Sequence, residues 1–365
     1  MYSKIRNKSL LILLFVFLSC AALFPAGADA FNLGGIIGSA INSATQQANV
    51  NKWLNYYDQE GREELFEVFK DSYTAKENPE LNILLSNIVE RLSIPIAQKD
   101  VSIIERPYNY FIAADKDFNA ACGLGHTMMV NEGVFTFLNN NEDQIAAVIA
   151  HEMVHGQEDH NIKGVKKQMS AIFARNLIGS QIGSYGGIFL LDLATANIMN
   201  AGITKPNEWE ADNLSFAFLT DAGYNPGAPA AVWQKITDSA QMKENQKRLR
   251  FVLVASTHPN SKDRRDNFAK KITEYSGGVV AVNKETGEIS VNGKAFLIPA
   301  DDGDIQGKER AYMIAGRLTS VYHAGTVGEA KAKDGAVFLG DAFLLKAGEK
   351  DPSAEDLALL LNTIK

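Results

Sequence analysis

The stretch HEMVH at residues 151–155 directly follows DQIAAVIA at residues 143–150, and the two together have the composition of one helix. On a helix, residues four positions apart lie on the same face, one turn from each other. His151 and His155 can therefore bind one Zn²⁺ together, and Glu152 between them can hold a water molecule against the metal. The alternative is an amphipathic core helix with two incidental histidines, so the rest of the chain must decide.

A second predicted helix offers the remaining ligand. A catalytic zinc site usually has three protein ligands and keeps water in the fourth position. The segment NEWEADN at residues 207–213 contains three carboxylates. Glu208 and Asp212 are four positions apart and share a face, whereas Glu210 points elsewhere. We therefore expect Glu208 to be the third ligand, and Asp212 to hydrogen-bond a zinc-bound imidazole and fix its tautomer. Taken alone, the segment could equally be an acidic face turned to solvent.

With these residues in place, the chain resembles the M48 family of gluzincin metallopeptidases, whose pattern is H-E-x-x-H followed by E-x-x-x-D. Three further stretches resemble family motifs in the family's order: NAAC at residues 119–122, GHTMMVNEGV at residues 125–134, and THP at residues 257–259 followed by Arg264. The likeness covers roughly residues 50–275. It implies an α+β fold: a mostly helical, zincin-like protease domain with a small β-sheet beside the active-site helix.

The resemblance implies peptide-bond hydrolysis with one zinc ion per chain, bound by His151, His155 and Glu208. Glu152 is not a ligand in this scheme but the general base. It takes a proton from a water molecule that the metal has acidified, and later gives the proton to the leaving amine.

The resemblance also suggests groups that contact the substrate. The tetrahedral oxyanion needs a second donor besides zinc, and the candidates are His258 and Arg264. An alternative for His258 is a turn that precedes a helix. Asn119, Ala120 and Ala121 are expected to offer a strand edge to an extended polypeptide, which would give main-chain recognition with little sequence preference.

Residues 1–30 have the composition of a secretory signal. A basic start precedes an apolar core at residues 10–18, which is too short to span a bilayer, and residues 28–30 read A-x-A. We expect a mature chain that begins at Phe31 and is exported, to the periplasm or the extracellular space. The alternative is a lipoprotein signal in which Cys20 is lipidated.

Charge and cysteine content restrict the partners. The chain has 36 basic and 43 acidic residues, and residues 1–30 contain three of the basic and one of the acidic residues, which leaves a mature net charge of −9. This argues against nucleic acid as a partner, which would require a basic face. Cys122 alone would remain after cleavage, so no intrachain disulfide is expected, and this thiol is expected to be a small buried hydrophobe.

The domain organisation follows from changes in pattern. We expect residues 31–275 to form the protease domain. Apolar residues at helical spacing and short β-like runs predict its elements: helices over residues 53–70 and 81–92, and strands over residues 101–105, 108–113 and 126–130. The apolar residues 169–200 are expected to form a helical hairpin over the site. They lack an uncharged run of about 20 apolar residues, so a membrane span is not expected, and peripheral contact with a membrane or with envelope complexes is left open.

After residue 275 the pattern changes to that of a small α/β domain of unknown role, residues 276–365. Its strands are expected on either side of Thr286-Gly287 and at residues 336–339 and 342–345, and its helices over residues 308–322 and from residue 353. No internal repeat is evident in the sequence.

These observations together predict a zinc-dependent endopeptidase that acts on polypeptide substrates, in particular unfolded or misassembled proteins of the cell envelope. One alternative is a chaperone-like or binding protein on a protease fold with little turnover. The intact Glu152 argues against it, because such a protein has no need of a general base. A second alternative is a zinc hydrolase that acts on a non-peptide substrate.

Overall fold

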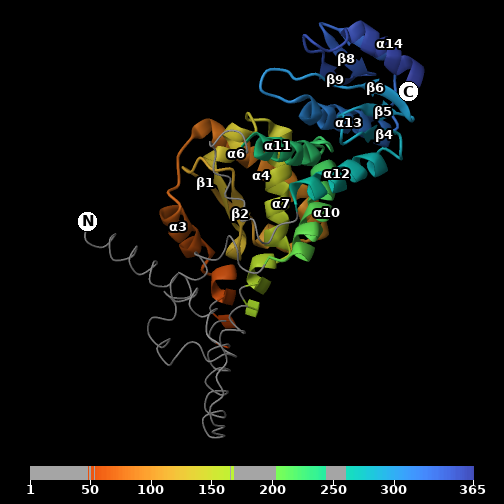
Figure 1. The fold of residues 1–365 in the computed structure, drawn as a ribbon. Coiled ribbons are helices and arrows are strands. Elements are labelled where there is room, and N and C mark those ends of the chain that lie inside the picture. Colours follow the sequence, from red (N-terminus) through yellow and green to blue (C-terminus); the bar gives the residue numbers. More distant parts are fainter. Residues whose placement is uncertain (1–47, 49–50, 53, 165, 168–202, 244–259) are drawn as a thin grey trace, which may run out of the picture. The chain divides into compact units, whose positions relative to one another are not determined.

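The structure is a computed structural model that describes residues 48, 51–52, 54–164, 166–167, 203–243 and 260–365 (Figure 1). All of them belong to one compact unit, Gln46–Lys365, of mixed helices and small sheets. The expectations for residues 1–30, for the helical hairpin at residues 169–200 and for His258 lie outside the described residues.

The helices before the first sheet include α3 (Arg62–Ser72), α4 (Pro79–Lys99) and α5 (Ser102–Glu105). The longest of these three, α4, packs on the two helices that carry HEMVH and NEWEADN. Helix α4 begins at Asn78, whose side chain accepts a hydrogen bond from the Leu81 amide. The strand expected at residues 101–105 is wrong, because this segment forms α5. The Asp100 side chain accepts a hydrogen bond from the Ser102 amide at 3.0 Å, which favours a helical turn.

A three-stranded sheet lies beside these helices, as expected. Its strands are β1 (Asn109–Ala113), β2 (Ala120–Cys122) and β3 (Thr127–Asn131), in the order β1-β3-β2. The central strand β3 is buried along its whole length, runs parallel to β1 and antiparallel to β2, and pairs Ala121 with Met129. Strand β2 is therefore at an edge of the sheet as far as the structure describes it.

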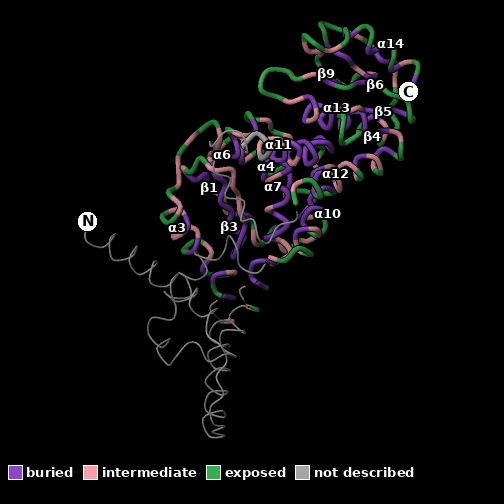
Figure 2. Tube along the Cα trace, in the orientation of Figure 1, coloured by how far each residue is buried: buried purple, intermediate pink, exposed green. Residues whose placement is uncertain are grey.

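Helix α7 (Glu142–Gln157) lies between this sheet and α10 (Lys205–Asp221) (Figure 1). Asn141 caps its N-terminus, and the Asn141 side chain accepts a hydrogen bond from the Gln144 amide. Two acidic residues in the first turn interact favourably with the positive end of the helix dipole. The other helices of this region are α6 (Glu132–Phe137), α11 (Ala228–Lys243) and α12 (Ser261–Tyr275). Figure 2 shows α7 as a largely buried helix. No helix in the described ranges is both long and apolar enough to cross a membrane.

The chain after residue 275 folds into two successive units, each a three-stranded antiparallel sheet followed by a helix. The first unit contains β4 (Val280–Val282), β5 (Ile289–Val291), β6 (Lys294–Leu297) and α13 (Gly307–His323), and the second contains β7 (Ala330–Lys333), β8 (Ala336–Leu339), β9 (Ala342–Lys346) and α14 (Ala354–Ile364). The expected strands and helices of this region are confirmed.

This topology is a repeat that the sequence analysis did not find. The sequence GKAFL begins at Gly293 and GDAFL begins at Gly340, and each sequence leads into the third strand of its unit. Both glycines have a positive φ, 74° and 61°, which glycine adopts at little cost. The two units also share helices, since α13 packs on β4 and β9 while α14 packs on β6, β7 and β8.

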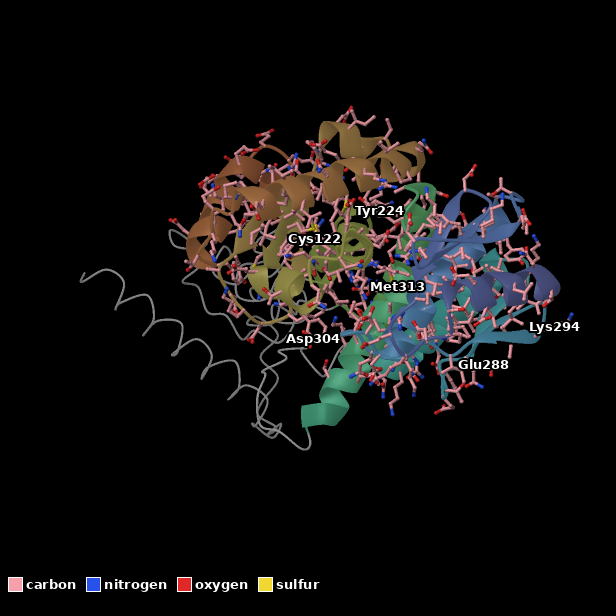
Figure 3. All side chains as sticks on the ribbon, turned by 90° about the horizontal axis from the view of Figure 1, so that it is seen from above. Cys122, Tyr224, Glu288, Lys294, Asp304 and Met313 are labelled. Carbon is pink, nitrogen blue, oxygen red and sulfur yellow. The ribbon has the colours of Figure 1, made fainter. Side chains whose placement is uncertain are left out.

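The two parts of the chain, before and after residue 275, make close contact. A Cβ atom on Gly227 would lie 1.9 Å from the Tyr312 carbonyl oxygen, so α13 approaches the start of α11 at backbone distance. The Asn225 amide donates to the carbonyl of Met313, labelled in Figure 3, at 3.0 Å. The buried Glu309 of α13 accepts a hydrogen bond of 2.8 Å from Gln144 in the first turn of α7. One continuous apolar core includes residues from both parts.

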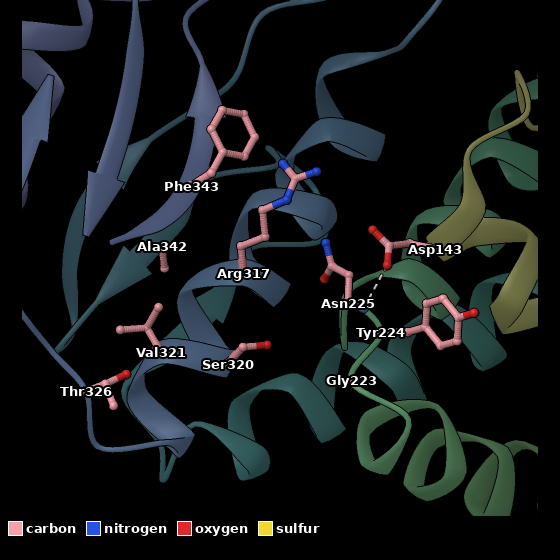
Figure 4. A pocket seen from close by; sticks show the side chains of 10 residues that line it. All are labelled: Asp143, Gly223, Tyr224, Asn225, Arg317, Ser320, Val321, Thr326, Ala342 and Phe343. Atoms are coloured by element: carbon pink, nitrogen blue, oxygen red, sulfur yellow. Dashed lines mark hydrogen bonds between the residues drawn. The ribbon is translucent and has the colours of Figure 1, made fainter. Parts of the chain in front are cut away.

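An open groove marks the surface where the two parts meet (Figure 4). Asp143 and Tyr224 line one side of it, and Arg317 and Phe343 line the other. The backbone N–H of Asn225 donates to Asp143 Oδ1 at 3.0 Å within the groove.

Expression of residues 31–275 without the rest tests whether a protease domain that ends at residue 275 can fold alone. Removal of α13 would expose the apolar face of α11 and leave Gln144 without its Glu309 partner. We therefore expect a product that is insoluble or metal-free, whereas residues 31–365 expressed in parallel give folded protein. A soluble fragment with full zinc content would instead support two separable domains.

Candidate active site

The two histidines of HEMVH lie in the last turns of α7 and face the same point. Nε2 of His151 and Nε2 of His155 are 3.1 Å apart, and both side chains are buried. Glu208 reaches them from the first turn of α10, with one carboxylate oxygen 3.5 Å from the His151 nitrogen and the other 3.5 Å from the His155 nitrogen. A capping box between Thr204 and Asn207 fixes the start of α10 and therefore the position of Glu208.

The donor atoms of these three residues are spaced as a zinc ion requires. Ligand atoms about 2.0–2.1 Å from Zn²⁺ lie roughly 3.3–3.4 Å from each other at the tetrahedral angle. The observed separations of 3.1 Å and 3.5 Å bracket that value. Two imidazoles and one carboxylate are also the donor set of a catalytic zinc site that keeps one open position. In the described part of the chain this is the one group of three such residues whose donor atoms converge.

Asp212 lies one turn after Glu208 and contacts the far side of His151. Its Oδ1 is 3.1 Å from His151 Nδ1, the ring nitrogen that faces away from the metal position. Arg264 of α12 donates from Nε to the other Asp212 oxygen at 2.8 Å, and its guanidinium lies over the Trp233 ring at 3.8 Å from the centroid. Arg264 also lies 3.4 Å from Glu208, so one buried cation faces two buried carboxylates.

The two buried carboxylates, Glu208 and Asp212, favour a positive charge on the groups that lie between them. Burial and the Arg264 charge lower the pKa of His151, but hydrogen bonds to Asp212 and Glu208 outweigh them and raise it to about 9. Burial alone would raise the pKa of Asp212, yet the Arg264 charge and the His151 hydrogen bond hold it below its usual value. Burial and the neighbouring His151 hold the pKa of His155 well below its usual range. Without metal, a proton on His151 therefore supplies part of the positive charge.

Sequence reasoning missed His160, which lies behind His155. The Nδ1 atoms of the two rings are 2.9 Å apart, and His160 Nε2 is 3.2 Å from a carboxylate oxygen of Glu210. Glu210 does point away from the ligands, as expected, but it has a partner there. The signal was available in the sequence, because His160 is the histidine that follows HEMVH by five residues. That spacing is not a helical one and was not considered.

The remaining predicted residues lie around this cluster. Glu152 is partly exposed on α7, unlike the buried histidines on either side of it. Ala120 and Ala121 are half-buried on the edge strand β2, against which α7 packs, and Asn119 precedes that strand. Cys122 is buried, as expected; burial and the nearby Glu152 charge raise the pKa of its thiol above the usual range.

Comparison with known proteins finds a matching family and several similar proteins. A family profile described as Peptidase family M48 matches residues 79–271, more than half of the chain, including α7, α10 and Arg264. Similar proteins include the putative beta-barrel assembly-enhancing protease of Vibrio cholerae, 23% identical over 206 residues, which are 54% of this chain and 40% of that protein. Metalloprotease LoiP of Escherichia coli (strain K12) is 27% identical over 174 residues, 46% of this chain and 64% of that protein. The mitochondrial metalloendopeptidase OMA1 of Schizosaccharomyces pombe is 24% identical over 219 residues, 60% of this chain and 59% of that protein. The chain covers less than two thirds of the length of each of these relatives.

Proposed function

The chain belongs to peptidase family M48. We propose that it is a zinc metalloendopeptidase that degrades unfolded or misassembled proteins of the cell envelope. His151, His155 and Glu208 are the proposed zinc ligands. The observation that carries the proposal is the buried convergence of their donor atoms beside the partly exposed Glu152.

Each residue of the site has a distinct task. Bound zinc would acidify a water molecule and polarise the substrate carbonyl. Glu152 accepts a proton from that water and returns it to the leaving amine. Asp212 holds His151 Nδ1 and so directs Nε2 of the same ring to the metal position. The burial of the ligands keeps competing solvent away from them and strengthens each electrostatic interaction.

The second oxyanion donor is better assigned to His258 than to Arg264. The Arg264 guanidinium already contacts Asp212, Glu208 and the Trp233 ring, and it is buried. These contacts suit a residue that fixes the carboxylates rather than one that meets the substrate. His258 lies outside the described residues, so its part in the reaction stays a prediction.

The edge strand β2 is the proposed site for an extended substrate. Its residues pair with β3, and the Asn119 carbonyl accepts a hydrogen bond from the Asn131 amide at 2.9 Å on that side. The opposite edge of Ala120 and Ala121 can add a substrate strand through main-chain hydrogen bonds, which require no particular side chain. Such recognition suits polypeptides that have lost or not yet reached their fold.

The envelope location rests on the predicted signal at residues 1–30, with lipidation of Cys20 as the alternative. One relative, a putative beta-barrel assembly-enhancing protease, supports a role in the envelope. Peripheral association with envelope complexes is part of the same proposal. The alternative function is that of a chaperone-like protein with little turnover. It does not explain the partly exposed Glu152, because such a protein needs no general base.

Casein cleavage with and without a chelator tests the proposed function. We expect the purified protein, residues 31–365, to fragment casein, to stop when zinc is removed, and to recover when zinc is returned. Chelator that has been saturated with zinc beforehand is the control and should leave cleavage intact. Casein that is bound but not cleaved by the zinc-loaded protein would favour the chaperone-like alternative.

A further inference from the structure

We propose that His160 and Glu210 form a hydrogen-bonded relay that positions the zinc ligand His155. The inference rests on the proposed function, because it assigns these residues a role toward the metal. They are positioning residues, since neither is among the three residues whose donor atoms converge on the metal position. The two contacts that define the relay are His155 Nδ1 to His160 Nδ1 at 2.9 Å and His160 Nε2 to Glu210 Oε2 at 3.2 Å.

One assignment of protons satisfies every contact in the relay. His155 must present an unprotonated Nε2 to a metal, so its proton is on Nδ1. That N–H donates to Nδ1 of His160, which is then unprotonated. The His160 proton is therefore on Nε2, where it donates to the Glu210 carboxylate. The acidic end of the relay thus fixes which nitrogen of His155 is free to bind the ion.

The relay is the counterpart of the contact behind the other histidine ligand. Asp212 holds Nδ1 of His151 at 3.1 Å, as His160 holds Nδ1 of His155 at 2.9 Å. Both arrangements end on α10, where Glu208 and Asp212 lie one turn apart and Glu210 lies between them in the sequence. Glu210, which the i, i+4 spacing made the less likely ligand, instead supports a ligand from behind.

The use of a histidine between His155 and a carboxylate has a physical reason. Glu208 and Asp212 are already fully buried and share one buried guanidinium. A third buried carboxylate against His155 would add an uncompensated charge at high cost. His160 is neutral and buried, and it connects His155 to Glu210, whose side chain is 50% exposed and stays hydrated.

The backbone after α7 brings His160 to this place. The helix ends at Gln157, and Asp159 adopts a left-handed conformation with φ of 53°, which aspartate tolerates better than most residues. The chain turns there and begins a new helical segment at His160. The His160 ring then lies 5.0 Å from the His155 ring, centroid to centroid.

Zinc affinity of two His160 variants tests the relay. His160→Leu keeps the approximate volume but removes the acceptor, and we expect zinc to bind about 10–100-fold more weakly, as for the loss of other residues behind metal ligands. His160→Asn keeps an acceptor oxygen for His155 Nδ1–H and should recover most of the affinity. Affinity is measured by competition with a chromophoric chelator, and the absorption of the Co²⁺-loaded proteins reports the coordination geometry independently of turnover.

Matched controls separate the relay from general effects on folding. His323 lies at the end of α13 and hydrogen-bonds the Tyr275 carbonyl. The substitution His323→Leu therefore removes a histidine remote from the site and should leave zinc affinity unchanged. Glu210→Gln keeps an acceptor for His160, and its loss of affinity should be smaller than that of His160→Leu. Thermal unfolding of each metal-free variant shows whether the fold is retained.

Three outcomes contradict the proposals in different ways. Wild-type protein that binds no zinc overturns the proposed function together with the relay. Wild-type protein that binds zinc, with a His160→Leu affinity within about twofold of it, overturns the relay alone. Equal losses of affinity in His160→Leu and His160→Asn, accompanied by an equal fall in unfolding temperature, would show that His160 serves the fold and does not orient His155.

Discussion

Replacing His155 by alanine is expected to abolish zinc binding and, with it, all peptidase activity. Nε2 of His155 lies 3.1 Å from Nε2 of His151 and 3.5 Å from Glu208 Oε1, so His155 supplies one of the three proposed ligands. A catalytic zinc site rarely survives on two protein ligands. The same substitution removes the partner of His160 and leaves both Glu208 and Asp212 buried without the ion that balances them. Metal content after dialysis, measured by elemental analysis, gives the result directly.

Two controls make the His155 result specific. Circular dichroism of His155→Ala shows whether the helices are retained, and His323→Ala, which changes a histidine outside the site, should keep one zinc ion per chain. Full zinc occupancy of His155→Ala would be incompatible with the ligand assignment. In that case the metal would have to be bound elsewhere in the chain.

The substitution Glu152→Gln is expected to retain zinc and fold but to lose proteolysis by about 10²–10⁴-fold or more, the usual contribution of general acid–base catalysis. Glutamine has nearly the size of glutamate and cannot accept the proton. Glu152 is partly exposed on α7, between the two histidine ligands in the sequence. The rate of casein cleavage at saturating zinc is the measurement.

The neighbouring acidic residue Glu158 provides the matched control for Glu152. It lies just after α7 and contacts Lys99 rather than the zinc ligands, so Glu158→Gln should cleave casein at nearly the wild-type rate. If Glu152→Gln cleaved at the wild-type rate and with normal zinc content, Glu152 would not be the base. The catalytic proton transfer would then have to be assigned to another group.

The ligand cluster was predictable because it depends on helical spacing alone. His151 and His155 share a face of α7, and Glu208 and Asp212 share a face of α10, in a geometry that any regular helix enforces. The sheet beside α7 was likewise predictable from short runs of β-forming residues. What remained open was the way in which the two faces meet, which depends on packing between segments far apart in the chain.

The features that were missed lack such local periodicity. His160 reaches His155 only because Asp159 turns the chain after α7, and nothing in the spacing of the two histidines indicates that turn. Arg264 was one of two candidates for the oxyanion donor, and its contacts with Asp212 and Trp233 become visible only when α12 packs on α10 and α11. The repeat after residue 275 rests on a few matching positions around Gly293 and Gly340, too few to be noticed without the topology.

Helix α7 connects two distant regions of the molecule. Its first turn is held by the hydrogen bond from Gln144 to Glu309, and its last turns carry the zinc ligands. Gln144 and His155 are about three turns, or roughly 16 Å, apart along the axis. A tilt of about 5° around the Gln144 end would therefore carry His155 sideways by roughly 1.4 Å. Misplacement of a reacting group by about 1 Å can cost about a hundredfold in rate. The residues after 275 supply none of the proposed ligands, but through Glu309 they help to fix the orientation of the helix that carries His151 and His155.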